Sequence, residues 1–187
     1  MKKFKEYAAP TVVLFVICVV AAFLLALTNK VTAPAIAEVN AANEAKARTV
    51  VFAAADRFGD AVETSVEKVD SVVPALDKAG NVIGYVVTSH DDKGYGGKIS
   101  VMTGVDAQGK VTGVSILDMS ETAGLGANAK RDTFREQFIG KIKGITVSKD
   151  EAGENSIDAL TGATVTSRAV TRAVNAAIEA AGGANNG

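Results

Sequence analysis

An uninterrupted apolar segment near the N-terminus constrains the fold of this chain more than any other feature. Residues 10–27 read PTVVLFVICVVAAFLLAL and contain no charged side chain. A helix that crosses the hydrocarbon core of a membrane needs about 17–25 predominantly apolar residues. The segment therefore predicts a single transmembrane helix, which we place at residues 10–28, and leaves most of the 187 residues to form a domain outside the membrane.

A cleaved signal peptide is the alternative interpretation of this segment, because lysines precede it. A typical signal has an apolar core of only about 7–15 residues, which is shorter than the run seen here. The best small-residue cleavage site, 31–33, lies beyond the run and is followed by Pro34. Cys18 follows the bulky Ile17 in mid-run, which disfavours a lipoprotein anchor. We therefore favour a retained membrane anchor.

The distribution of lysines predicts the orientation of this helix. Lys2, Lys3 and Lys5 precede the apolar run, and only Lys30 follows closely. Positive charge is retained on the cytoplasmic side of a membrane. We therefore expect residues 1–9 in the cytoplasm and the C-terminal domain on the extracytoplasmic side of a bacterial inner membrane.

Composition excludes several classes of function. The net charge of −1 and the absence of Lys/Arg clusters argue against nucleic acid as a partner. Cys18 is the only cysteine, so one chain can form neither a disulfide nor a thiolate metal site. His90 is the only histidine and stands beside Asp91 and Asp92, where we expect an exposed loop residue rather than a metal ligand.

Residue patterns after the membrane segment predict a helix followed by β-structure. The apolar spacing over 35–58 indicates a helix that continues outward after a break at Pro34 and ends at Gly59, within a helical linker at residues 29–60. Short Val- and Ile-rich runs broken by glycine predict strands over 65–118.

Two segments of this β-region share one pattern. Leu76–Tyr85 and Val105–Val114 both contain Asp-x-x-Gly-x-Val-x-Gly. Asp and Gly supply turns, and Gly tolerates positive φ. We interpret the pattern as two antiparallel hairpins rather than a duplicated binding site.

The C-terminal third predicts two helices and a short strand. A short helix is expected over 129–139 and a strand over 145–148. An apolar stripe over 165–181 predicts a packed amphipathic helix that stops at Gly182-Gly183, followed by a disordered tail at 182–187. The predicted class is thus α+β: one transmembrane helix, then one domain at residues 61–181 with antiparallel hairpins and a packed C-terminal helix.

The segment 158–164, DALTGAT, stands at the start of the last predicted helix. One hypothesis is that Thr161 or Thr164 only caps this helix. The other is that the helix N-terminus binds a phosphate, which the small Gly162 and Ala163 allow to approach the backbone and toward which the Thr164 hydroxyl points. The residues alone leave the two hypotheses equal.

The same segment resembles, at every defined position, the Asp-x-x-(Ser/Thr)-Gly-Ala-Thr signature of the FMN-binding domain family. In that family the final Thr is joined to FMN through a phosphoester, which a separate magnesium-dependent flavin transferase forms from FAD. The resemblance implies FMN as the cofactor, Thr164 as its covalent attachment site and a flavin transferase as a partner in maturation. It also implies that FMN is held by four neighbours: Asp158, Thr161, Gly162 and Ala163.

A second segment, 121–127, is similar to the family's Glu-Thr-Pro-Gly-Leu-Gly loop, with Ala123 in place of Pro. Taken alone, the segment indicates only a turn. The resemblance implies that the loop lines the flavin, with Leu125 packing on the ring and Thr122 bonding to it. Arg168 we interpret as a solvated residue rather than a phosphate ligand. The implied lining residues are Glu121, Thr122, Gly124, Leu125 and Gly126.

The resemblance covers residues 85–181. With one membrane helix and this length, the chain is most similar to the G subunits of the Rnf complexes, which are ion-translocating ferredoxin:NAD⁺ oxidoreductases. The C subunit of the sodium-translocating NADH:quinone oxidoreductase has the same plan and is usually longer. The resemblance implies an electron relay that works with other subunits of the complex, one of which moves Na⁺ or H⁺, and not an enzyme that completes a reaction alone.

Two further hypotheses stay open. One is a stand-alone, membrane-anchored flavinylated electron carrier. The other is a non-redox anchored binding module, in which the Thr cluster is only a helix cap.

Overall fold

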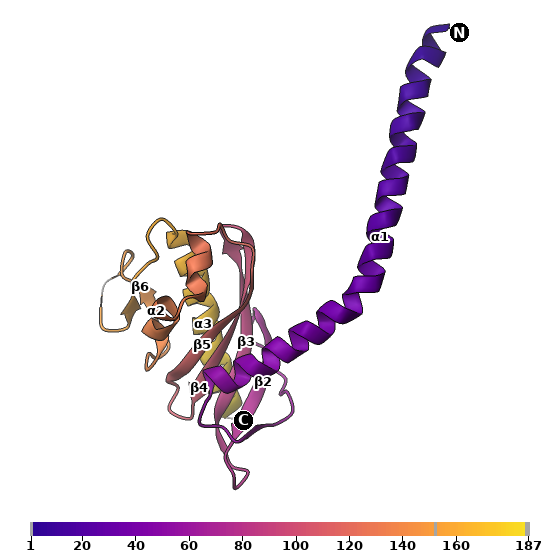
Figure 1. The fold of residues 1–187 in the computed structure, drawn as a ribbon. Coiled ribbons are helices and arrows are strands. Elements are labelled where there is room, and N and C mark those ends of the chain that lie inside the picture. Colours follow the sequence, from indigo (N-terminus) through magenta and orange to yellow (C-terminus); the bar gives the residue numbers. More distant parts are fainter. Residues whose placement is uncertain (1, 152, 186–187) are drawn as a thin grey trace. The chain divides into compact units, whose positions relative to one another are not determined.

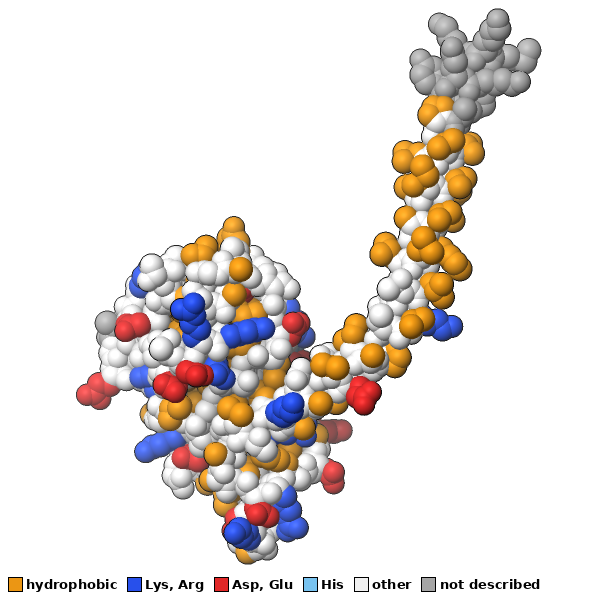
Figure 2. Space-filling view, in the orientation of Figure 1, with side chains coloured by type: hydrophobic (Ala, Val, Ile, Leu, Met, Phe, Trp, Pro, Cys, Tyr) orange, Lys and Arg blue, Asp and Glu red, His pale blue; other side chains and the backbone are white. Residues whose placement is uncertain are grey.

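The computed structural model describes residues 2–151 and 153–185 (Figure 1). The chain forms two compact units, one up to Asn43 and one from Glu44 onward. Helix α1 (Lys2–Val51) makes up the first unit and contributes its last eight residues to the second. Large apolar side chains between Val12 and Leu27 are exposed, and Figure 2 shows them along the visible face. Within the described residues, α1 is the one helix long and apolar enough to cross a membrane, and its apolar 18-residue window has a mean hydropathy of 2.9.

Two predictions about this helix are wrong. The expected break at Pro34 does not occur, because a proline removes a single hydrogen bond and the alanine-rich sequence around it favours helix. The helix also ends at Val51 rather than at Phe58. Phe58 lies instead in strand β1 (Arg57–Phe58), which pairs with the next strand and so satisfies its backbone there.

A five-stranded antiparallel sheet forms the centre of the second unit, and every strand lies beside its neighbours in sequence. The predicted hairpins are confirmed. In the first turn the Asn81 N–H donates to Asp77 Oδ1 at 2.8 Å, and in the second the Lys110 N–H donates to Asp106 Oδ1 at 2.8 Å. The strands after β1 are β2 (Val69–Leu76), β3 (Val82–Gly94), β4 (Gly97–Asp106) and β5 (Val111–Met119).

The last glycine of the shared hairpin pattern has a packing role. A Cβ on Gly84 would lie 2.6 Å from the ring of Phe52, and a Cβ on Gly113 would lie 2.8 Å from Cα of Val51. Gly104, which is paired with Gly113, would meet the carbonyl oxygen of Val51. The three glycines therefore form a depression across β3, β4 and β5 that receives the end of α1.

Helix α3 (Thr164–Asn185) covers the opposite face of the sheet with its predicted apolar stripe. The helix does not stop at Gly182-Gly183, so the prediction of a disordered tail is wrong for 182–185. The Tyr85 hydroxyl donates to the carbonyl of Ala184 at 3.0 Å and holds this end against β3. Residues 186–187 lie outside the described part of the chain.

An ion pair at the buried carboxylate of Asp91 fixes α3 to β3. Arg172 donates from Nε and Nη2 to the two oxygens of Asp91, at 2.9 and 2.7 Å. Lys68 Nζ lies 3.3 Å from the same carboxylate. Burial raises the pKa of Asp91, but the hydrogen bonds from Arg172, the Lys93 N–H and Lys68 lower it further, so that the pKa falls to about 2.

Short elements connect β5 with α3. The helix expected over 129–139 is a series of three short turns, in which Phe134 and Phe138 meet edge to face at 5.6 Å in the core. The strand expected over 145–148 pairs in parallel with a second short strand. These features confirm the α+β class. The elements are η1 (Gly126–Lys130), α2 (Asp132–Arg135), η2 (Glu136–Phe138), β6 (Thr146–Val147) and β7 (Ser156–Ile157).

Candidate functional site

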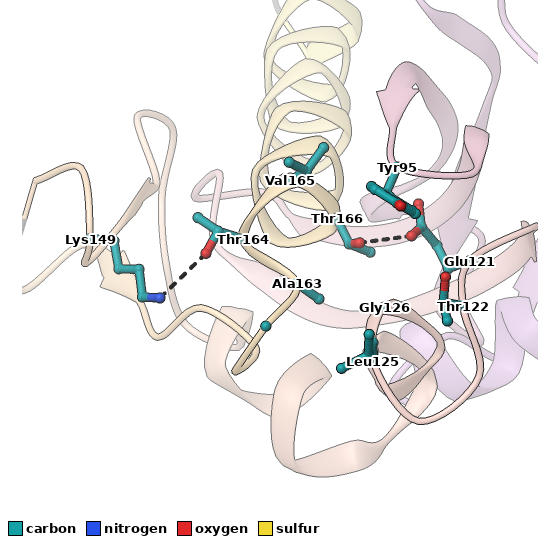
Figure 3. Close-up of a pocket in the computed structure, with 11 residues that line it drawn as sticks. Tyr95, Glu121, Thr122, Leu125, Gly126, Lys149, Ala163, Thr164, Val165 and Thr166 are labelled. Atoms are coloured by element: carbon teal, nitrogen blue, oxygen red, sulfur yellow. Dashed lines mark hydrogen bonds between the residues drawn. The ribbon is translucent and has the colours of Figure 1, made fainter.

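A pocket of about 490 Å³ lies where the β3–β4 turn, the loop after β5 and the start of α3 meet (Figure 3). Pockets that hold small molecules and cofactors typically measure about 300–1,000 Å³. The side chain of Lys149, in the segment after β6, also lines the pocket. The pocket is lined by Tyr95, Glu121, Thr122, Leu125, Gly126, Lys149, Gly162, Ala163, Thr164, Val165 and Thr166.

The start of α3 has no side-chain cap. The N–H of Ser167 donates to the carbonyl of Ala163 at 3.0 Å, which places Ala163 at the N-cap position. Alanine has no side-chain acceptor. Within the described residues, the N–H groups of the first three helical residues have no protein acceptor, and neither Thr161 nor Thr164 accepts a backbone N–H. The helix start therefore offers free donors and a partial positive charge to the pocket.

The geometry of the turn that precedes α3 explains why residue 162 is a glycine. Gly162 has a φ of 75°, which glycine adopts without strain, and a Cβ there would approach Leu125 at 3.2 Å. The turn is closed by the Ala163 N–H, which donates to the carbonyl of Leu160 at 3.0 Å. The Ser167 hydroxyl accepts the N–H of Leu160 at 2.9 Å. These bonds hold the backbone bent toward the pocket.

One end of the pocket carries positive charge. Lys149 Nζ donates to Thr164 Oγ1 at 3.4 Å (Figure 3). The adjacent Asp150 forms an ion pair with Arg168, whose Nε donates to Oδ2 of Asp150 at 2.7 Å. This hydrogen bond lowers the pKa of Asp150. Arg168 thus binds a carboxylate at the surface and does not line the pocket.

Glu121 connects three walls of the pocket. Its Oε1 accepts the N–H of Gly96 at 3.1 Å, and its Oε2 accepts the hydroxyl of Thr166 at 2.9 Å. A Cβ on Gly126 would lie 2.6 Å from Thr166 Oγ1, so only glycine allows the loop after β5 to pack this closely against the Glu121–Thr166 hydrogen bond. The other end of the pocket is apolar and open to solvent: Tyr95, Leu125 and Val165 are 76%, 45% and 44% exposed.

The structure brings most of the predicted site residues together. Seven of them line the pocket, including Thr164 and Glu121. Asp158, Thr161 and Gly124 do not line it. Asp158 accepts a hydrogen bond from the Ser148 hydroxyl at 2.9 Å and so shapes the loop before α3. Gly124 has a φ of 77° in the loop after β5.

Four lining residues escaped the sequence analysis. Tyr95 was detectable in principle, because it stands among three glycines, which mark a turn. Val165 and Thr166 follow the recognised signature directly. Lys149 carries no sequence signal, because β6 and a loop bring it to the pocket.

We predicted that His90 lies in an exposed loop, and this prediction is wrong. It lies in β3 and is partly buried, with Nδ1 3.0 Å from Oδ2 of Asp70 on the neighbouring strand β2. Strand pairing places the imidazole beside this carboxylate. The described residues contain no group of three or more side chains suited to a metal ion.

The structure therefore has one helix of membrane-spanning length and an α+β domain, whose pocket suits a small ligand with one anionic and one apolar end. A family described as FMN-binding domain matches residues 94–179. The G subunit of the Na⁺-translocating ferredoxin:NAD⁺ oxidoreductase complex of Acetobacterium woodii is 39% identical, over 89% of this chain and 87% of that protein. The G subunit of the proton-translocating complex of Clostridium ljungdahlii is 37% identical, over 89% of this chain and 86% of that protein. The chain belongs to this family of G subunits.

A solved structure supports the fold. The crystal structure of Shewanella oneidensis NqrC superposes with a TM-score of 0.50 at 22% identity, over 72% of this chain and 71% of that chain. The residues of the pocket fit FMN, which has a phosphate at one end and a planar ring at the other. Free N–H groups, a hydroxyl and an ammonium suit the phosphate, and the apolar end formed by Tyr95, Leu125 and Val165 suits the ring.

Proposed function

We propose that this chain is an electron-transfer subunit of a membrane-bound, ion-translocating ferredoxin:NAD⁺ oxidoreductase complex and that it carries FMN. The uncapped start of α3, with Thr164 beside Lys149, is the observation that carries the proposal. The similarity to the two G subunits over most of both chains supports the complex, and the FMN-binding match supports the cofactor.

The attachment of FMN is proposed to be covalent, at the hydroxyl of Thr164. In the loading reaction Oγ1 forms a bond to the flavin-side phosphorus of FAD, the bond to the AMP moiety breaks, and AMP leaves with the electron pair. The hydroxyl proton passes to a base of the separate flavin transferase. Thr164 is half-buried at the pocket wall, so its hydroxyl is reachable from solvent.

The side chains of the pocket have distinct tasks in this proposal. FMN supplies the redox chemistry when it is bound. Gly162 and Ala163 leave room at the phosphate, Glu121 holds the loop after β5, and Leu125 and Tyr95 shield the apolar end from water. The chain relays electrons to partner subunits of the complex in this proposal, as the similarity to the G subunits supports.

Membrane insertion is proposed to follow the lysine distribution. Residues 10–28 span the membrane, residues 29–60 lead outward, and the FMN-binding domain at 61–181 lies on the extracytoplasmic side. A Cys18→Ser chain with Asp118→Cys tests the sidedness, because Asp118 is exposed. An impermeant maleimide should label it on intact spheroplasts, whereas Lys3→Cys should react only after permeabilisation. The reverse result would invert the proposed orientation.

The attachment is tested by the intact mass of the full-length chain produced together with a flavin transferase. The wild type should gain the mass of FMN less one water, and Thr164→Ala should not. Thr133→Ala is the matched control, because Thr133 is exposed and lies outside both the pocket and the attachment signature. A bare wild-type mass, with the transferase active on another acceptor, would refute the covalent site. Copurification of further subunits from the native membrane distinguishes a complex from a stand-alone carrier.

A further inference from the structure

We propose that Lys149 is the phosphate-binding side chain of this site and that it sets the rate at which Thr164 is loaded. The inference rests on the proposed function, since it concerns the same pocket. Lys149 Nζ donates to the very oxygen that would carry the phosphate, Thr164 Oγ1, at 3.4 Å (Figure 3). A phosphoryl group on that oxygen would therefore lie within reach of the ammonium.

The charge of Lys149 is not used elsewhere in the described part of the chain. Its side chain makes no ion pair there, whereas Lys143 lies 3.2 Å from Glu179 and Lys68 lies 3.3 Å from Asp91. Two carboxylates of the same region have other partners: Asp150 binds Arg168, and Asp158 accepts a serine hydroxyl. Glu151 and Glu154 form no ion pair with Lys149 among the described residues. An unpaired cation beside free helix N–H groups is complementary to an anion.

The backbone around Lys149 is fixed, although the side chain is exposed. The N–H groups of Asp150 and Glu151 donate to the carbonyl of Val147 at 2.7 and 3.0 Å and close a turn. Arg168 holds Asp150 with two donors, and Arg168 lies one turn along α3 from Thr164. The helix that presents the hydroxyl therefore also positions the loop that presents the ammonium.

The chemistry of loading gives the ammonium a task. Negative charge accumulates on the non-bridging phosphoryl oxygens while Oγ1 forms its bond to phosphorus and AMP departs. A lysine ammonium donates hydrogen bonds and accepts none, so the hydroxyl proton goes to another group. The ammonium is a positioned positive charge, and its electrostatic stabilisation is greatest when the phosphoryl group carries the most negative charge.

The test measures loading of the full-length chain, purified without flavin and incubated with flavin transferase, FAD and Mg²⁺. Intact mass spectrometry follows the fraction converted with time. Lys149→Met should load about tenfold more slowly, which corresponds to about 1.4 kcal/mol, because the charge-assisted hydrogen bond to the phosphoryl group is lost. Lys149→Arg should retain most of the rate. Lys143→Met is the matched control, as Lys143 is an exposed lysine outside the pocket, and should load like the wild type.

Ionic strength gives a second readout that a structural role of Lys149 would not move. The ratio of wild-type to Lys149→Met rates should fall as salt rises from about 0.05 to 0.5 M, because screening weakens the attraction of an exposed charge. Equal rates for both chains at low salt, with the wild type fully loaded, would overturn the role of Lys149 and leave the proposed function intact. A wild type that never loads would remove the proposed function itself.

Discussion

The hydroxyl of Thr166 donates a 2.9 Å hydrogen bond to Oε2 of Glu121, 45 residues away in the chain. The other oxygen of the same carboxylate accepts the N–H of Gly96 at 3.1 Å. One side chain therefore joins the first turn of α3, the loop after β5 and the β3–β4 turn. These are the segments that form the pocket, so its shape depends on this carboxylate.

Removing the Thr166 hydroxyl should weaken this connection. Thr166→Val keeps the shape of a buried side chain and should lower the free energy of unfolding by about 1 kcal/mol, because Glu121 loses a partner. A double-mutant cycle with Glu121→Ala, measured by urea unfolding in detergent, should give a coupling of about 1 kcal/mol. Thr171→Val is the control, since that hydroxyl bonds within α3. Equal coupling for both threonines would contradict the connection.

The Asp91 ion pair predicts a pH dependence of stability. The pKa of Asp91 is lowered from 3.8 to about 2, so its contribution is complete above pH 4 and is lost as the pH falls from about 4 to 2. That shift corresponds to about 2 kcal/mol. Asp91→Asn should lose this amount at pH 7, and its difference from the wild type should shrink toward pH 2.

Urea unfolding at pH 7, 4 and 2.5 measures this difference. Asp118→Asn is the control, because Asp118 is exposed and should change the free energy of unfolding by less than about 0.5 kcal/mol. A difference between Asp91→Asn and the wild type that stays constant with pH would show that Asp91 does not act through its charge.

Tyr95 should shield the bound flavin from solvent. The side chain is 76% exposed, so Tyr95→Ala should change the free energy of unfolding by less than about 0.5 kcal/mol. In the loaded protein, iodide should quench flavin fluorescence more strongly in Tyr95→Ala than in the wild type, while Tyr95→Phe retains the ring and should behave like the wild type. Ile139→Ala removes an exposed apolar side chain outside the pocket and serves as the control. Unchanged quenching in Tyr95→Ala would place the flavin elsewhere.

Gly113 should not tolerate a side chain. A Cβ there would lie 2.8 Å from Cα of Val51, so Gly113→Ala should lower the free energy of unfolding by about 1–3 kcal/mol. Gly153→Ala is the matched control, because no atom lies within 4 Å of its Cβ position and it should be nearly neutral. Thermal unfolding of both variants in the same detergent makes the comparison. Two equal melting temperatures would show that the end of α1 does not pack on β5.

Local chemistry made part of this structure predictable from the sequence. The Asp and Gly residues of the two turns specify hairpins by hydrogen bonding within five residues, and the stripe over 165–181 specifies a helix by its period alone. The signature ending at Thr164 likewise lies within one turn and one helix start. Such features need no information about the rest of the chain.

Contacts between distant segments explain the remainder. α1 ends at Val51 because Thr112 in β5 donates its hydroxyl to the Val51 carbonyl at 2.6 Å, and α3 continues past its glycines because Tyr85 reaches Ala184. Lys149 and Tyr95 enter the pocket through loops whose paths depend on strand pairing. Helix propensity and apolar periodicity depend on local sequence, so they do not predict these contacts between distant residues.

The glycine depression under the end of α1 changes how the internal repetition of this chain should be understood. Gly84 and Gly113 occupy the same position of the shared pattern, and both face the residue pair Val51–Phe52. Strands β3 and β5 both pack against the end of α1, so each needs a residue without a side chain at this position. The shared final glycine is thus accounted for by one packing contact, independently of any function for the repeated pattern.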